Sequence, residues 1–231
     1  IILVLYEKFG VKETKEEIQP DEIDEQHPII IVGMGRFGQI VNDLLRLSGY
    51  ATTIVDLNPT MIKGFNEYGI KSYFGDASRR EFLIAAGLEN AEMLIVAIDN
   101  KEQANAIVHF AREVNPNIKI IARAFDRFHT FDLYNSGADE IVRETFDSAV
   151  RTGRLALEAL GMESATAKAI AKYYFKADRH EVELMSQVYE PGMAIFNNPV
   201  MRDIAQKCDQ KMAAHIQEIL LKAQEQTQEE V

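Results

Sequence analysis

The feature that most constrains this chain is a run of β-branched apolar residues that breaks into a glycine-rich loop. Residues 29–40 have the sequence IIIVGMGRFGQI, which contains G-x-G-x-x-G and continues as a helix. Gly33 permits a tight turn off the strand, Gly35 lets a phosphate approach bare backbone, and Gly38 lets the helix lie close to the sheet. Since the N–H groups at a helix start favour an anion, the pattern predicts a strand followed by a phosphate-binding loop.

A second strand-like run, residues 51–56, ends in Asp56, which lies 18 residues beyond Gly38. An acidic residue about 20 residues after the glycine loop completes the dinucleotide pattern, because its carboxylate accepts hydrogen bonds from ribose hydroxyls. A carboxylate at this position repels a 2′-phosphate, and no arginine follows directly. The two signals together predict a site for NAD, AMP or ADP rather than for NADP.

The chain between His27 and Glu144 alternates strand-like and helix-like segments, which predicts a parallel sheet with helices on both faces. The strand-like segments are short and apolar on consecutive positions, as in strands covered on both sides; they are residues 28–32, 51–56, 71–75, 92–98, 118–123 and 139–142. The helix-like segments between them are residues 36–48, 60–68, 78–87, 101–114 and 127–136. We therefore expect an α/β fold, a Rossmann-like doubly wound parallel sheet, over residues 27–144.

Residues 1–26 combine an apolar start with an acidic stretch. A helix that spans a bilayer needs about 20 apolar residues, so residues 1–6 are either a short element on their own domain or the end of a membrane helix. Residues 12–26 carry seven acidic and two basic residues. That stretch predicts a solvated linker, to which we assign no binding role.

The chain changes character after Glu144. Thr145 is expected to cap a helix over residues 145–160, with a stripe of apolar or small residues: Phe146, Ala149, Val150, Gly153, Leu157 and Leu160. An exposed apolar stripe of this kind is stabilised by packing against another surface. We therefore expect residues 145–162 to cross to a second subunit; the alternative is that they pack on their own sheet. Residues 163–231 predict a C-terminal helical extension, whose polar tail from Ala223 is expected to fray.

Composition excludes several functions. A net charge of −11 and a pI near 5.0 argue against nucleic acid, because its binders need basic surfaces. The single Cys208 excludes an intrachain disulfide, and the five histidines show no ligand spacing, so metal binding has no support. No Ser-x-x-x-Lys or Tyr-x-x-x-Lys pair follows residues 92–98, and no histidine falls at a predicted strand end. We therefore expect a ligand sensor with no catalytic residues.

The carboxyl ends of the predicted strands supply the candidate binding residues, because ligands on open parallel sheets bind there. Asp76 suits the adenine amine, with Ala77 and Ser78 as the rim, while Arg36 and Arg123 suit phosphate. Turn and cap roles for Asp76 and Ser78, and surface ion pairs for the arginines, remain alternatives. The full set of predicted nucleotide-binding residues is Gly33, Gly35, Arg36, Phe37, Gly38, Asp56, Leu57, Asn58, Asp76, Ala77, Ser78, Ala97, Ile98, Asp99 and Arg123.

Five blocks carry a family resemblance: IVGMGRFGQ at 31–39, YFGDAS at 73–78, AID at 97–99, IIARA at 120–124, and RETF through TGRLALE within 143–158. Together they resemble the cytoplasmic nucleotide-binding domain, called KTN or RCK, of bacterial potassium transport proteins. The last block is the most specific and is similar to the glutathione-gated potassium efflux (Kef) branch. The resemblance covers about residues 20–190.

The resemblance implies a regulatory domain attached to a multi-pass antiporter-like membrane protein, at the cytoplasmic face of the bacterial inner membrane. Such a domain dimerises through the helix at 145–160 and binds AMP or NAD(H) in the Rossmann cleft. Glutathione holds it closed and glutathione adducts of electrophiles open it, so that potassium leaves and protons enter. An ancillary oxidoreductase is a candidate partner, and the apolar start then corresponds to the end of the last membrane helix.

Glutathione contacts carry over from the family only in part. Arg143 matches an arginine after the last strand, and Tyr68 matches an aromatic residue that ends the second helix. The alternative roles are an interface ion pair for Arg143 and a core aromatic for Tyr68. Asp43 and Asp178 replace an arginine and an asparagine, and Arg46 stands one turn beyond Asp43 as a substitute. Two other functions stay open, a soluble NAD-dependent oxidoreductase and a nucleotide-gated regulator of potassium uptake.

Overall fold

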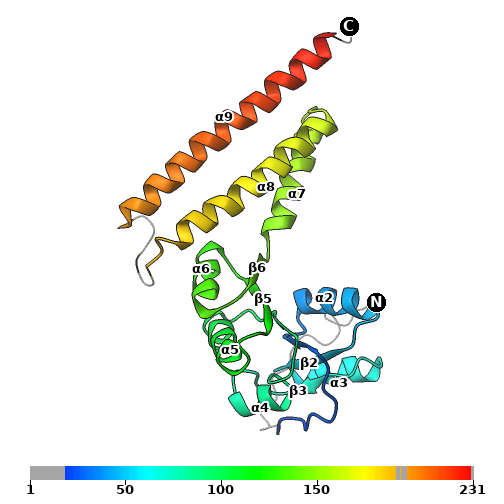
Figure 1. The fold of residues 1–231 in the computed structure, drawn as a ribbon. Helices are drawn as coiled ribbons and strands as arrows, with labels where there is room; N and C mark the ends of the chain where they lie inside the picture. The colour runs from blue at the N-terminus through cyan, green and yellow to red at the C-terminus, as the bar shows by residue number, and fades with distance from the viewer. Residues whose placement is uncertain (1–18, 191–192, 194–196, 230–231) are drawn as a thin grey trace. The chain divides into compact units, whose positions relative to one another are not determined.

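The computed structural model describes residues 19–190, 193 and 197–229 (Figure 1). The apolar start at residues 1–6, with its expected membrane-helix end, lies outside the described residues. Within them, no helix is both long and apolar enough to cross a bilayer. The chain divides into two compact units, with the boundary between Glu144 and Thr145, and each unit is described by itself.

The first unit is built on one sheet of six parallel strands within its described residues, in the order β3-β2-β1-β4-β5-β6. Strand order reverses between β1 and β4, which pair side by side at the centre. The strands are β1 (Ile29–Val32), β2 (Thr52–Asp56), β3 (Tyr73–Phe74), β4 (Met93–Val96), β5 (Lys119–Ala124) and β6 (Glu140–Arg143). This order confirms the expected Rossmann-like doubly wound sheet.

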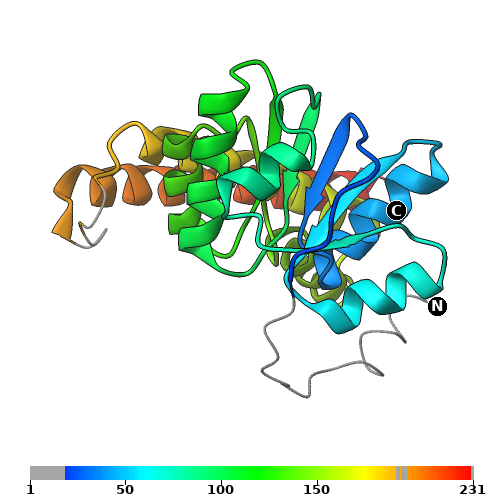
Figure 2. The same ribbon diagram turned by 90° about the horizontal axis from the view of Figure 1, so that it is seen from below.

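Helices cover both faces of the sheet, because alternate residues of each strand point to opposite sides. Ile30 and Val32 join one buried cluster with side chains of α4, α5 and α6, whereas Ile29 and Ile31 join a second with α2 and α3. Figures 1 and 2 show α5 and α6 on the opposite side of the strands from α3. These helices are α2 (Arg36–Leu47), α3 (Pro59–Glu67), α4 (Arg80–Ala85), α5 (Lys101–Val114) and α6 (Arg127–Ser136).

Residues 19–26, the described part of the acidic stretch, are mostly exposed, as expected of a solvated segment, but they are also hydrogen-bonded to the sheet edge. Asp21 N donates to Phe74 O over 2.8 Å, and Phe74 N donates to Asp21 Oδ2 over 2.7 Å. The Tyr73 hydroxyl donates to Asp24 Oδ1 over 2.7 Å, and Lys71 Nζ lies 2.8 Å from the same oxygen. These hydrogen bonds, first from Lys71 and then from Tyr73, lower the pKa of Asp24. The short edge strand β3 has backbone groups to satisfy, and the stretch satisfies them.

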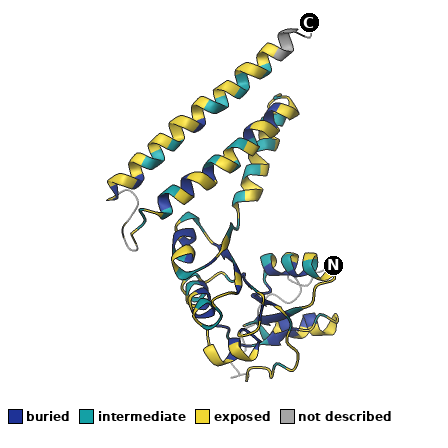
Figure 3. Cartoon of the chain, in the orientation of Figure 1, coloured by how far each residue is buried: buried dark blue, intermediate teal, exposed yellow. Residues whose placement is uncertain are grey.

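The second unit consists of α7 (Phe146–Ala159), α8 (Ser164–Ser186) and α9 (Pro199–Glu229), with α8 packed against both of the others. No residue of α7 is buried, and Figure 3 shows little dark blue along it. Thr145 does not cap α7 with its side chain; Ser148 Oγ instead donates to Thr145 O over 2.9 Å. α9 continues through Ala223 to Glu229, so the described part of the polar tail is helical, and its fraying stays a prediction.

Candidate functional site

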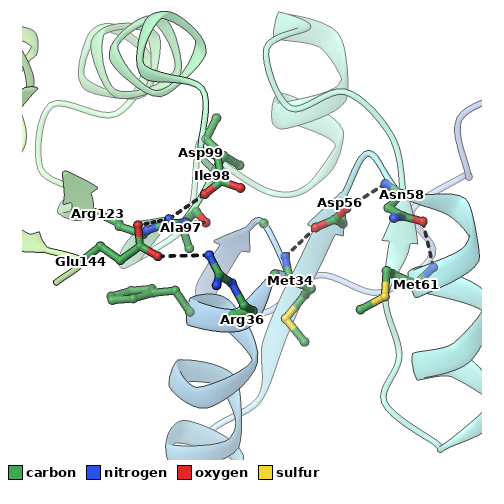
Figure 4. A pocket seen from close by; sticks show the side chains of 13 residues that line it. Met34, Arg36, Asp56, Asn58, Met61, Ala97, Ile98, Asp99, Arg123 and Glu144 are labelled. Carbon is green, nitrogen blue, oxygen red and sulfur yellow. Dashed lines mark hydrogen bonds and ion pairs between the residues drawn. The ribbon is translucent and has the colours of Figure 1, made fainter. Parts of the chain in front are cut away.

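Two adjoining cavities lie where the strands of the first unit end. The larger, about 200 Å³ and here named the phosphate-loop cavity, is lined by Gly33, Met34, Gly35, Arg36, Phe37, Asp56, Asn58, Met61, Ala97, Ile98, Asp99, Arg123 and Glu144 (Figure 4). The smaller, about 70 Å³ and named the rim cavity, is lined by Val32, Gly33, Val55, Asp56, Leu57, Gly75, Asp76, Ala77, Ser78, Ile98, Gln103 and Ile107. They share Gly33, Asp56 and Ile98. Of the residues expected to bind a nucleotide, every one except Gly38 lines one of the two cavities.

The three loop glycines have different physical roles. Gly33 adopts a φ of +97°, which L side chains rarely adopt, and Gly38 carries no Cβ because one there would lie 1.9 Å from Gly33 O. A Cβ on Gly35, by contrast, would meet nothing within 4 Å. Gly33 and Gly38 therefore allow the loop to fold, whereas Gly35 leaves open space over backbone at the start of α2, as a bound phosphate requires.

Asp56 is fixed in place by the loop it faces. Its Oδ2 accepts from Met34 N over 2.6 Å and its Oδ1 from Asn58 N over 2.7 Å (Figure 4). Burial raises the pKa of this carboxyl, and the two backbone hydrogen bonds only partly offset the rise. The buried Gln39 side chain in turn donates to Met34 O over 2.9 Å. The carboxylate therefore stands in one orientation at the cavity wall.

Charged side chains from three strand ends and the glycine loop meet on the other side of the cavity. Arg123, only 6% exposed, donates to Ala97 O over 3.2 Å, to Asp99 Oδ1 over 2.6 Å and to Glu144. Burial alone would lower the pKa of Arg123, but its hydrogen bonds with Glu144 and Asp99 outweigh that effect and raise it. The Phe37 ring lies 5.7 Å from the guanidinium carbon.

Arg36 differs from Arg123 in exposure. Its side chain is 67% exposed at the first position of α2, and its Nη2 lies 3.7 Å from Glu144 Oε1. In Figure 4 it points across the cavity toward Glu144. Arg36 is thus the arginine of this cavity that a ligand can reach. Arg123 is buried and paired with two carboxylates, so it does not form the surface ion pair that was its alternative role.

The turn after β3 shows the local bonding expected of an ordinary cap. Asp76 Oδ1 accepts from Ser78 N over 2.9 Å and from Ser78 Oγ over 2.6 Å. Asp76 and Ser78 therefore do have the turn and cap roles that were the alternative to ligand binding. A role in binding adenine remains a prediction, which their place on the rim cavity permits.

The residues expected to contact glutathione line neither cavity. Tyr68 follows α3 and is 59% exposed, which rules out a core aromatic, and Arg143 is the last residue of β6. The sequence also missed Met34, Met61 and Glu144 as lining residues of the phosphate-loop cavity. Glu144 did have a signal, since it sits in the RETF block directly after the last strand.

One histidine corrects the expectation that none stands at a strand end. His129 is 1% exposed, and its Nδ1 accepts from Phe125 N, the first residue after β5. Burial and the charge of Lys101 lower its pKa. His129 lines neither cavity, so it adds no acid or base to the site. In the described part of the chain, no group of three His, Cys, Asp or Glu is placed to hold a metal ion.

This geometry agrees with a known family. The family profile described as the TrkA-N domain matches residues 29–144, the stretch that carries the sheet and both cavities. The chain belongs to the TrkA-N domain family. The resemblance noted from the sequence blocks is thereby confirmed.

Relatives of this TrkA-N protein include a potassium-efflux protein and two solved domains. It is 39% identical over 189 residues to the glutathione-regulated potassium-efflux system protein KefC of Escherichia coli, covering 81% of this chain but 30% of KefC. A structure of the Shewanella denitrificans Kef CTD in AMP-bound form is 38% identical with a TM-score of 0.65, covering 70% of this chain and 99% of that one. The TrkA-N domain of the inner membrane protein ybaL from Escherichia coli is 31% identical with a TM-score of 0.53, covering 60% and 99%.

Proposed function

We propose that this chain is the nucleotide-binding regulatory portion of a potassium efflux system and that it binds AMP in the phosphate-loop cavity. The observation that carries the proposal is the fixed Asp56 carboxylate beside the open backbone of Gly35. The 38% identity to a Kef CTD in its AMP-bound form supports the choice of ligand. NAD(H), which shares the adenosine and phosphate groups, is the second candidate for the same cavity.

The residues present fit such a ligand. Asp56 would accept from ribose hydroxyls, and the N–H groups at the start of α2 with Arg36 would hold the phosphate. Asp76 on the rim cavity would receive the adenine amine. A bound nucleotide would supply adenosine and phosphate contacts and no chemistry, so we assign no catalytic residue and no enzymatic activity.

A homodimer through α7 is the proposed assembly. Its support is a hollow of about 410 Å³ between α7 and α8, lined by the apolar or small residues Phe146, Ala149, Val150, Gly153, Leu157, Ile170, Ala171 and Tyr174 together with Arg154. Ala149 and Gly153 lie one turn apart, where small side chains let a second helix come close. An apolar face of this kind on an unburied helix suits the same face of a second copy.

Gating is proposed to follow from a population shift between two arrangements of the paired domains. A ligand shifts such an equilibrium only by its difference in affinity for the two arrangements, about 1.4 kcal/mol for each tenfold. Glutathione and its adducts would act near the dimer interface, with Tyr68 and Arg143 as the residues carried over from the family. The effect on the whole efflux protein is part of this proposal, since the chain spans 30% of KefC.

Thermal melting with and without AMP tests the nucleotide assignment. AMP should raise the melting temperature, because a ligand that binds only the folded state stabilises it by mass action. Asp56→Ala should remove most of that rise. The matched control is Asp139→Ala, which also removes a carboxylate that accepts a backbone N–H, that of Ile120 at 2.6 Å, but away from both cavities. An AMP shift in Asp56→Ala equal to that of the parent would contradict the ribose assignment.

Calorimetry separates the efflux proposal from the other functions. A bulky glutathione adduct should bind in the presence of saturating AMP, because the two sites are separate. Turnover of NADH with a carbonyl or quinone substrate would instead favour an oxidoreductase. Binding of nucleotide with no response to glutathione or its adduct would favour a regulator of potassium uptake.

A further inference from the structure

The phosphate-loop cavity contains more negative than positive side chains. Its charged lining residues are two arginines, Arg36 and Arg123, and three carboxylates, Asp56, Asp99 and Glu144. Only Asp56 has a partner role with ribose in the proposed function. The other two carboxylates face the arginines that would otherwise be available to phosphate.

Arg123 has little positive charge to offer a ligand. Its side chain is 6% exposed, and it is already paired with both Asp99 and Glu144. The remaining arginine, Arg36, is accessible but lies 3.7 Å from Glu144. A phosphate that binds Arg36 therefore comes close to the Glu144 carboxylate, whose side chain is 23% exposed.

Each further phosphate adds negative charge to a cavity whose three carboxylates already outnumber its two arginines, both of which are engaged by Glu144. Like charges a few ångströms apart repel strongly in a partly buried site, where screening by water is weak. A single phosphate is served by the α2 N–H groups and Arg36 and needs nothing from Arg123. A diphosphate or triphosphate without a bound cation has no second accessible arginine in this cavity.

We propose that Glu144 is the residue that limits the phosphate count of the ligand, so that the site selects nucleoside monophosphates over the corresponding diphosphates and triphosphates. The inference rests on the proposed function, because it assigns the preference of that same cavity. Glu144 acts by occupying Arg36 and Arg123 and by repelling additional phosphate.

Calorimetry with AMP, ADP and ATP in EDTA tests the inference on the whole chain. The parent should bind ATP at least tenfold more weakly than AMP. Glu144→Gln, which keeps the shape and removes the charge, should narrow that ratio at least fivefold while AMP affinity stays within about threefold. The control is Glu140→Gln at the start of β6, the strand that ends just before Glu144. The Glu140 carboxylate is 52% exposed and lines neither cavity, so this variant should leave the ratio unchanged.

A second measurement uses only the parent, so it tests the inference even if the Glu144→Gln variant fails to fold. Raising salt from 0.05 to 0.5 M should narrow the ratio of ATP to AMP dissociation constants, because salt screens repulsion. A parent that binds ATP as tightly as AMP, or a ratio unchanged by both the substitution and salt, overturns the inference alone. Absence of AMP binding to the parent overturns the proposed function, and the inference with it.

Discussion

The two units of this chain differ in how far their apolar side chains are buried. In the first unit, both faces of the sheet are closed by helices, and residues such as Ile30, Ile31 and Phe65 are at most 1% exposed. In the second, α7 buries none of its residues, and Leu155 and Leu160 are 47% and 85% exposed. The first unit therefore has a complete core of its own, whereas the second unit leaves apolar side chains exposed.

One helix of the first unit departs from this contrast. The outward face of α2 exposes Ile40, Leu44 and Leu47, each by more than 60%. These residues recur at i, i+4 and i+7 and so form one stripe. The first unit thus has a closed core around the cavities but one helix that presents apolar side chains to its surroundings.

The largest expected effect tests whether the loop of the first unit is as tightly built as its packing indicates. Gly38→Ala should destabilise the ligand-free protein by about 3 kcal/mol or more, because its Cβ would lie 1.9 Å from the Gly33 carbonyl oxygen. Gly35→Ala should leave the ligand-free melting temperature nearly unchanged and remove AMP binding. Urea denaturation measures the stability of each ligand-free variant, and calorimetry measures its AMP binding. Equal stability losses in both variants would contradict the assigned roles.

The next effect addresses the second unit. Gly153→Leu should leave the fold of a single chain intact, since a Cβ there meets nothing within 4 Å. Overpacking a helix interface costs about 1–3 kcal/mol, so the dimer dissociation constant should rise about tenfold to a hundredfold. Light scattering after size-exclusion chromatography measures it, with the neighbouring exposed Thr152→Leu as the control. A dimer equally stable in both variants would remove α7 from the interface.

A smaller effect concerns the buried histidine of the first unit. His129 Nε2 is buried and finds no hydrogen-bond partner among the described residues. Burial and then the charge of Lys101 lower the pKa of His129, although Asp126 and Asp132 act in the opposite direction. Because the folded pKa lies below the ordinary value of 6.5, the unfolded chain takes up the proton first. Stability should therefore fall as pH decreases below about 6.5, the loss ending below the folded pKa.

Urea denaturation at pH 7.5 and 5.5 measures this pH dependence. His129→Gln should flatten it by about 1 kcal/mol or less. His109→Gln, in which the replaced side chain is 64% exposed on α5, should leave it as in the parent. If both variants keep the full slope, another group causes the acid sensitivity.

The smallest effect tests the acidic stretch at the edge of the sheet. Tyr73→Phe removes the hydroxyl that donates to Asp24 and accepts from Glu25 N at 3.1 Å, and should cost about 1 kcal/mol. Amide hydrogen exchange at residues 21–27 should speed up in this variant. Unchanged exchange there would show that the stretch is held without the Tyr73 hydroxyl, by bonds such as those of Asp21 with Phe74 and of Lys71 with Asp24.

Most of the fold and of the cavity lining followed from the sequence because both depend on local signals. Apolar runs, the glycine loop and the acidic residue after β2 each report a nearby backbone conformation. Glu144 was missed as a lining residue because its contact with Arg36 joins positions far apart in the chain. The hydrogen bonds of Asp21 and Asp24 to the sheet edge were not predicted for a similar reason, since the charge pattern of residues 12–26 says nothing of the edge strand β3.

The central claim is that the proposed nucleotide site is complete within the first unit of a single chain. Calorimetry of AMP with Gly153→Leu, at a concentration where light scattering shows a monomer, tests it most directly. The AMP dissociation constant should equal that of the parent, measured where a dimer is expected, within about twofold, since every residue that lines either cavity lies before Thr145. A loss of AMP affinity of tenfold or more in the folded monomer would contradict the claim.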